Sequence, residues 1–166
     1  MDSKLTLFSQ IISKIDRVIF KKIVKEKKTD YRNKGFDSWT HLVSMLFCHF
    51  AKSTSVRDIS NGLRSATGNL NHLGIKTAPS KSSISYQNGK RDADLFKDLY
   101  FILLEQLGQH TKQKRVKLKI KVPVYLLDST LISLCLSLFD WATYRTKKGA
   151  VKMHTLLEYD AKLPVY

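Results

Sequence analysis

The sequence has few of the residues that build covalent or metal-linked frameworks. It contains two cysteines, Cys48 and Cys135, without a paired spacing, so neither a disulfide framework nor a zinc module is expected. Both lie in apolar runs, which is typical of buried, reduced thiols. The five histidines are scattered, and no pair of them has the spacing that metal ligands need.

Long apolar runs are missing as well. The longest uncharged stretch, Ser38 to Ala51, is too short to span a bilayer. Residues 1–4 carry mixed charge and no apolar block follows them, so we expect no signal peptide. These absences predict a reducing, cytoplasmic location and no membrane partner.

Acidic residues are scarce relative to basic ones. The chain has 29 Lys plus Arg against 14 Asp plus Glu, which gives a net charge of +15 and a pI near 9.9. This excess is the electrostatic footprint of a protein that binds a polyphosphate, usually DNA or RNA. Ribosomal proteins and membrane-surface proteins share the same composition. The apolar fraction of 43% predicts a folded chain and not a disordered one.

Helical periodicity extends to about residue 112. Apolar residues three and four apart predict one amphipathic helix from Leu5 to Ile23. Asp37 is expected to cap a second helix, with an apolar stripe from Leu42 to Phe50. Further helical segments are expected after Ser55, at Leu70–Leu73, from Ser80 to Gly89, and from Asp92 to about Gly108, where Leu107 should face inward.

After residue 112 the period changes to that of β-strands. Two short apolar strands, Pro123–Asp128 and Leu131–Leu136, are expected to be buried on both faces. A third, alternating strand is expected at Val151–Tyr159, followed by a tight turn. Ahead of them lies a basic run without acids, which is a solvated linker or edge strand, an arm that contacts phosphates, or both: Lys112, Lys114, Arg115, Lys117, Lys119 and Lys121.

Asp128 is the residue that points most directly to chemistry. It closes an apolar strand and precedes Ser129 and Thr130, and burying a lone charge is expensive. Position alone leaves two explanations: the carboxylate caps a turn at the strand end, or it is a ligand for a hard cation in a cleft.

The motifs around Asp128 extend in order over most of the chain. The block around it comprises Tyr125 to Phe139, Trp141 to Gly149, and Val151 to His154. Upstream motifs are Phe8-Ser-Gln, Ser55-Val-Arg-Asp-Ile, His72-Leu-Gly and Lys90-Arg-Asp. Together they resemble the DDE-type transposases of the bacterial insertion sequence 4 family, with their helical N-terminal module and the first-Asp part of their catalytic core.

The resemblance implies an α+β protein with a ribonuclease-H-like catalytic core. In that family two Asp and one Glu hold two Mg²⁺ ions, and phosphoryl transfer occurs at the DNA of the transposon ends. Asp128 would be the first metal ligand and catalytic carboxylate. The residues expected to line the DNA path are Arg145, Lys147, Lys148, Lys152 and His154, for which a solvated loop and strand face is the alternative.

We expect three regions: a helical DNA-binding module (1–112), a basic linker or edge strand (113–122) and a truncated core (123–166). The family's second Asp and its Glu would fall beyond residue 166. Glu158 and Asp160 are not expected to replace them, because a third strand lies two places from the first, about 9–10 Å away. On this interpretation Mg²⁺ is not bound stably and catalysis by the chain alone is not expected. A sheet without its further strands and covering helices should expose its apolar faces, and a second copy of the chain is one way to complete it.

Two other interpretations stay open. The chain is either a stand-alone DNA-binding regulator or inhibitor of transposition, or a decayed reading frame without function. For a regulator, Ser55 to Gly89 would hold a helix-turn-helix with Ser80 to Lys90 as the reading helix, although the loop between its helices is longer than that motif allows.

Overall fold

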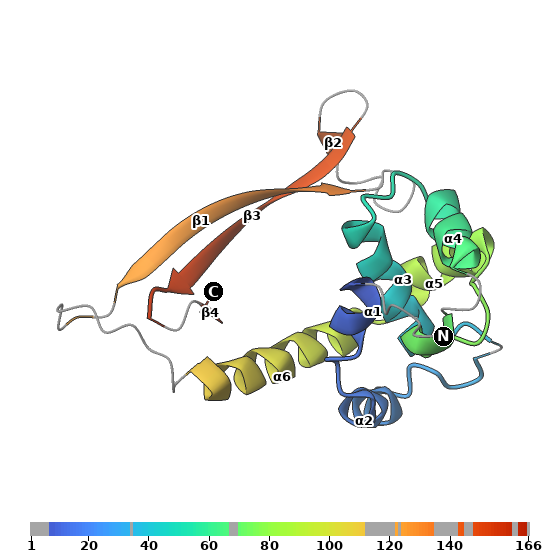
Figure 1. Cartoon of the computed structure of the whole chain (residues 1–166), viewed down its shortest axis with the longest axis horizontal. Coiled ribbons are helices and arrows are strands. Elements are labelled where there is room, and N and C mark those ends of the chain that lie inside the picture. The colour runs from blue at the N-terminus through green and yellow to red at the C-terminus, as the bar shows by residue number, and fades with distance from the viewer. Residues whose placement is uncertain are drawn as a thin grey trace, which may run out of the picture.

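Six α-helices, one 3₁₀ turn and a four-stranded antiparallel sheet make up the described part of the chain. The structure is a computed structural model that describes residues 7–33, 35–66, 70–111, 122, 124–134, 143–144, 148–160 and 163–165. Figure 1 shows most helices gathered at one end, with the long helix α6 extending from them and a long two-stranded ribbon arching over α6. The expected α+β class is therefore confirmed, although the finer ribonuclease-H-like assignment is not.

The elements follow one another along the chain in this order: α1 (Leu7–Ile12), α2 (Arg17–Lys27), α3 (Ser38–Phe50), α4 (Val56–Ser65), η1 (Leu70–Leu73), α5 (Lys81–Lys90), α6 (Asp94–Thr111), β1 (Tyr125–Leu134), β2 (Thr143–Tyr144), β3 (Lys148–Glu158) and β4 (Leu163–Pro164).

The single helix expected from Leu5 to Ile23 is wrong, because the described chain forms two helices here. Asp16 is extended, and its carboxylate accepts hydrogen bonds from the backbone N–H groups of Val18 and Ile19. An Asp in this position satisfies backbone donors that a new helix leaves open. The apolar spacing continues across the break, so periodicity alone did not reveal it.

Three expected helix starts are confirmed by their caps. The side chains of Asp37, Ser55 and Ser80 accept hydrogen bonds from backbone N–H groups in the first turns of α3, α4 and α5. The expected inward positions of Phe50 and Leu107 are wrong: each is 55% exposed. Both stand near the ends of their helices, beyond the residues that pack into the core.

The described core lies entirely within the helices and their connections, between Ile12 and Leu99. Trp39 lies near its centre: its ring meets Phe20 edge to face at 5.4 Å, and its Nε1–H donates to the Leu73 carbonyl (2.8 Å). Gly74 follows with a φ of +70°, and a Cβ there would collide with the Arg17 guanidinium. Glycine suits both the backbone angle and the close approach.

Strand β1 is one continuous element, so the expected division into two strands is wrong. It pairs with β3 without interruption from Tyr125↔Glu158 to Leu134↔Gly149. Leu127 is 74% exposed and Leu131 52% exposed. Burial on both faces, which the apolar runs suggest by themselves, is therefore wrong, whereas the exposure expected for a sheet without further strands and covering helices is found in the described residues. The main described contact between helices and sheet runs from α6 to β4, and it leaves these side chains of β1 exposed.

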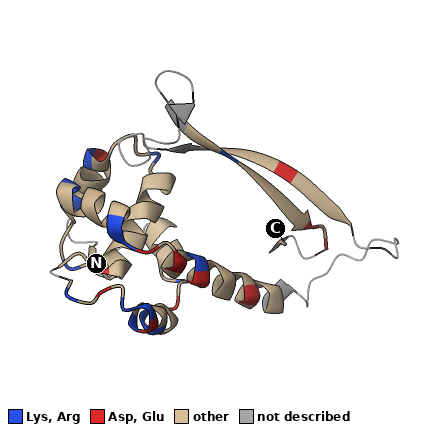
Figure 2. Cartoon of the chain, turned by 180° about the vertical axis from the view of Figure 1, so that it is seen from behind, with Lys and Arg blue, Asp and Glu red and all other residues tan. Residues whose placement is uncertain are grey.

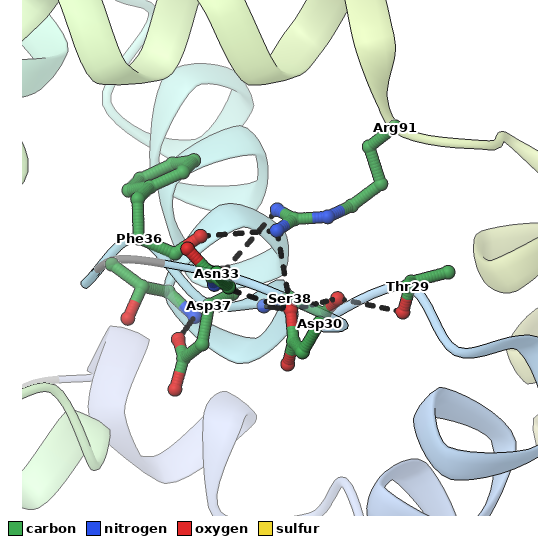
Figure 3. Close-up of polar contacts among 8 residues, drawn as sticks. Thr29, Asp30, Asn33, Phe36, Asp37, Ser38 and Arg91 are labelled. Atoms are coloured by element: carbon green, nitrogen blue, oxygen red, sulfur yellow. Dashed lines mark hydrogen bonds and ion pairs between the residues drawn. The ribbon is translucent and has the colours of Figure 1, made fainter.

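A buried guanidinium joins three segments of the helical region. The Arg91 side chain, only 1% exposed, bonds Asp30 Oδ1 (3.2 Å) and donates to the carbonyls of Phe36 (3.0 Å) and Asp37 (3.4 Å). Asp30 Oδ1 also accepts from the backbone N–H and the hydroxyl of Ser38, both at 2.8 Å. Figure 3 shows these contacts converging between the end of α5 and the start of α3.

His41 lies beside this network in the core. It is 2% exposed, and its ring contacts the rings of Phe36 at 5.5 Å and Phe96 at 5.4 Å. Burial, and next the nearby Arg91 charge, lower the pKa of His41 from 6.5 to about 4. The imidazole is therefore neutral at pH 7 and behaves as an aromatic core residue.

Replacing Arg91 should destabilise the helical region strongly. Arg91→Leu leaves two carbonyls and a partly buried carboxylate without their cation, at a cost of about 2–4 kcal/mol in the free energy of unfolding. Arg91→Lys should also lose stability, because one ammonium cannot reproduce the planar fork. Urea denaturation measures both, with the exposed Arg57→Leu as the matched control. Equal midpoints for Arg91→Leu and the control would contradict this role.

Stability should fall with acidity because of His41. Between about pH 6.5 and about pH 4 the unfolded chain binds a proton that the folded chain excludes, so stability decreases as pH falls through this window. The full difference corresponds to about 3 kcal/mol. In His41→Phe, which keeps an aromatic ring, the total loss of unfolding free energy between about pH 6.5 and about pH 4 should be smaller by that amount, so the slope in this window should be flatter. An unchanged slope would show that His41 is not the group responsible.

Candidate nucleic-acid interface

Asp128 lies in the middle of β1 and not at a strand end. It is exposed, pairs with Thr155 across the ladder, and accepts a hydrogen bond from Thr130 Oγ1 at 2.6 Å. The explanation that it caps a turn at the end of a buried strand is therefore wrong. Its carboxylate is open to solvent on one face of the ribbon.

The ribbon separates Asp128 from the described basic residues expected near it. Side chains alternate along a strand, and directly paired residues of an antiparallel ladder share a face. Lys152 pairs with Leu131 and His154 with Ser129, so both lie on the face opposite to Asp128. The DNA contacts of Lys152 and His154 stay predictions, on a different surface from the carboxylate.

The distance argument against Glu158 also needs correction. Strand β3 is the direct neighbour of β1, and it is β4 that lies two places away. Glu158 pairs with Tyr125, which is three residues from Asp128 on the same strand. Because side chains alternate along a strand, Tyr125 and Glu158 lie on the face opposite to Asp128. Within the described residues, no group of three potential metal ligands comes together.

Most of the other predicted DNA-binding residues cannot be placed. Lys148 belongs to β3, opposite Tyr144. The remaining predicted contacts lie outside the described residues: Lys112, Lys114, Arg115, Lys117, Lys119, Lys121, Arg145 and Lys147.

The helical region contains a basic groove that the sequence interpretation missed. Its volume is about 650 Å³, and its two walls are the turn after α2 (residues 27–33) and the corner between α5 and α6 (residues 86–92). We call this cavity the basic groove. Figure 2 shows Lys and Arg distributed over the helices, whereas the described strands carry few charges.

Two of the five groove cations have internal acidic partners. Arg91 is bonded to Asp30, and Lys27 Nζ lies 2.9 Å from Asp98, whose hydrogen bond raises the pKa of Lys27. No described ion pair holds the other three, Lys28, Arg32 and Lys90. The groove thus presents three cations to solvent, and its lining contains one acid, Asp92.

Each wall also carries an exposed tyrosine beside a cation. Tyr31 is 72% exposed, with the Arg32 guanidinium 5.2 Å from its ring centre. Tyr86 is 62% exposed, with Lys90 Nζ 5.3 Å from the ring centre and donating to the phenol oxygen at 3.1 Å. Such distances are those of cation–π contacts.

The backbone of the first wall is unusual. Lys28 and Arg32 have positive φ angles of 52° and 57°, a conformation that is uncommon for residues other than glycine. The Lys28 N–H bonds the Lys25 carbonyl and the Thr29 N–H bonds the Val24 carbonyl, closing α2. The Arg91 network described above then links this wall to the other.

A smaller polar cavity continues the groove along α5. Its volume is about 330 Å³, and it shares Asn33, Tyr86 and Gln87 with the basic groove. Ser80 and Ser83 from the first turn of α5 complete its hydroxyl and amide lining. The two helices considered for a helix-turn-helix, α4 and α5, pack together, but the fifteen residues between them exceed the tight turn of that motif.

The comparisons with known proteins give one match. Residues 3–76 match a family described as a domain of unknown function, DUF4372, which is less than half of the 166-residue chain. No curated protein and no solved structure matches the chain. Among the described residues, no helix is both long and apolar enough to cross a membrane. The match includes the first wall of the basic groove and excludes the second.

Proposed function

We propose that the chain is a DNA-binding protein of the transposase type and that its helical region contacts the DNA of transposon ends. The observation that carries the proposal is the basic groove, where Lys28, Arg32 and Lys90 have no described acidic partner. Phosphates are the partners that such a cluster recognises, and they position a protein on DNA.

Two further observations support the transposase assignment. The matched domain is found in transposase-like proteins. Strands β1, β3 and β4 lie side by side in that order in one antiparallel sheet that follows the helices along the chain, which agrees with the proposed order of a helical module followed by the strands of a core. The core and its DNA chemistry remain part of the proposal.

The described residues do not fit the Mg²⁺ pair that the resemblance implies. The face of Asp128 is otherwise formed by Leu126, Thr130 and Ile132 of β1 and by Val151, Met153, Thr155 and Leu157 of β3. One carboxylate is too few, because a two-metal site needs several oxygen ligands around both ions. We therefore derive no catalytic step, and the proposed function is DNA binding.

A regulator of transposition that acts through DNA binding alone is the second candidate. It is favoured by the location of the described hydrophobic core, which lies entirely in the helical region together with the groove. Both candidates require the groove to bind DNA, so the same experiment tests the shared step.

Binding of the full chain to a labelled duplex should depend steeply on salt. For about five phosphates engaged, log K against log salt should have a slope of about −4 to −5. Replacing Lys28, Arg32 and Lys90 together by Gln should reduce the magnitude of the slope by about 2–3 and weaken binding on the order of 10–100-fold. Fluorescence anisotropy at several salt concentrations measures both quantities.

A matched control replaces the exposed Lys52, Arg57 and Lys76, which do not line the groove, by Gln. This variant has the same net charge as the groove variant and should retain more of the wild-type affinity and slope. Equal losses in the two variants would reject the groove as the binding surface. A wild-type slope near zero would reject nucleic acid as the partner.

A further inference from the structure

In binding the backbone of a duplex, the tyrosines of the basic groove could use their hydroxyl groups but not the faces of their rings. The phosphates of a duplex would contact Lys28, Arg32 and Lys90. A paired strand, however, keeps its bases stacked inside the double helix, so no base face is available to Tyr31 or Tyr86. Yet both tyrosines are mostly exposed, on opposite walls of one cavity. Their placement suits a ligand that has aromatic faces as well as phosphates.

Unpaired nucleotides are such a ligand. Proteins that bind single strands combine a cationic groove for the backbone with aromatic rings on which bases stack. In this chain each ring comes with its own cation: Arg32 at Tyr31, and Lys90 at Tyr86. A base on the open part of the ring would leave its phosphate beside that cation. The groove volume of about 650 Å³ is within the range of pockets that enclose small organic ligands.

The neighbouring polar cavity adds groups suited to base edges. Tyr86 lines both cavities, and Asn33 and Gln87 lie in the wall that they share. Amide side chains offer donors and acceptors together, as the exposed edges of an unstacked base require. A base stacked on Tyr86 is therefore next to groups able to bond its edge.

We propose that the basic groove binds unpaired nucleotides of a DNA strand, with one base stacked on Tyr31 and another on Tyr86. The inference rests on the proposed function, because it concerns the same groove, and it replaces a generic phosphate surface by a site for single-stranded DNA. The arrangement predicts a preference for single strands over a duplex, and this preference should depend on the rings and not on charge.

The test compares the full chain with its variants on two probes at one salt concentration: a labelled mixed-sequence single strand and the blunt duplex of the same length. The wild-type chain should bind the single strand at least about 10-fold more tightly. Tyr31→Leu and Tyr86→Leu should each weaken single-strand binding about 10-fold, within the range measured for base–aromatic stacking. Duplex binding should change less than about twofold, and the salt slope should stay the same.

Two controls separate stacking from general damage. Tyr31→Phe and Tyr86→Phe keep the rings and should retain the preference for single strands. Tyr100→Leu removes a tyrosine that is 49% exposed on α6, outside the groove, and should have no effect. Urea midpoints establish that each variant is folded.

The inference fails, while DNA binding by the groove stands, if the Leu variants weaken both probes equally or neither. It fails together with the proposed function if the Gln variant of Lys28, Arg32 and Lys90 binds both probes as tightly as the wild-type chain. A wild-type preference for the duplex also overturns it.

Discussion

The ion pair between Arg91 and Asp30 is the constraint on which the helical region depends. Sixty-one residues separate the partners, yet one carboxylate oxygen and two backbone carbonyls hold the guanidinium at the point where α5 ends. Burial disfavours the charge and lowers the pKa of Arg91, while Asp30 and Asp37 act in the opposite direction. A buried charge that satisfies several acceptors fixes geometry more than it adds net stability. Here it fixes the distance between the two walls of the basic groove.

Local signals in the sequence predicted the helical region well. Asp37, Ser55 and Ser80 precede helices whose first N–H groups they accept, and a cap is a short-range interaction readable from neighbouring residues. Features that depend on packing between segments distant in sequence could not be predicted in this way. Asp16 also caps a helix, but it lies within a continuous apolar period that conceals the break between α1 and α2, and α2 then packs against the distant helix α6. The basic groove belongs to this second class, because its walls are far apart in sequence.

The strands illustrate a different limit of sequence interpretation. The apolar character of β1 was predicted correctly, but burial on both faces did not follow from it, since burial depends on what covers the sheet and not on the strand itself. The polar residues Asp128 to Thr130 suggested a break between two strands. In the structure they pair with Thr155, His154 and Met153 like their neighbours, because backbone hydrogen bonding does not depend on side-chain polarity. The pairing register of β1 and β3 determines which residues share a face with Asp128, and composition alone does not give this register.

The match to residues 3–76 bears on which portion of the chain could be transferred to another protein and keep its fold. A boundary drawn at residue 76 cuts through the physical unit, because the buried residues Ile84, Leu95 and Leu99 and the cation that neutralises Asp30 all lie after it. A gene fusion that transferred only the matched stretch would carry an acidic residue without its counterion and a core with one side open. A portion that keeps this core and the Arg91–Asp30 pair therefore extends at least through Leu99, and it includes both walls of the basic groove.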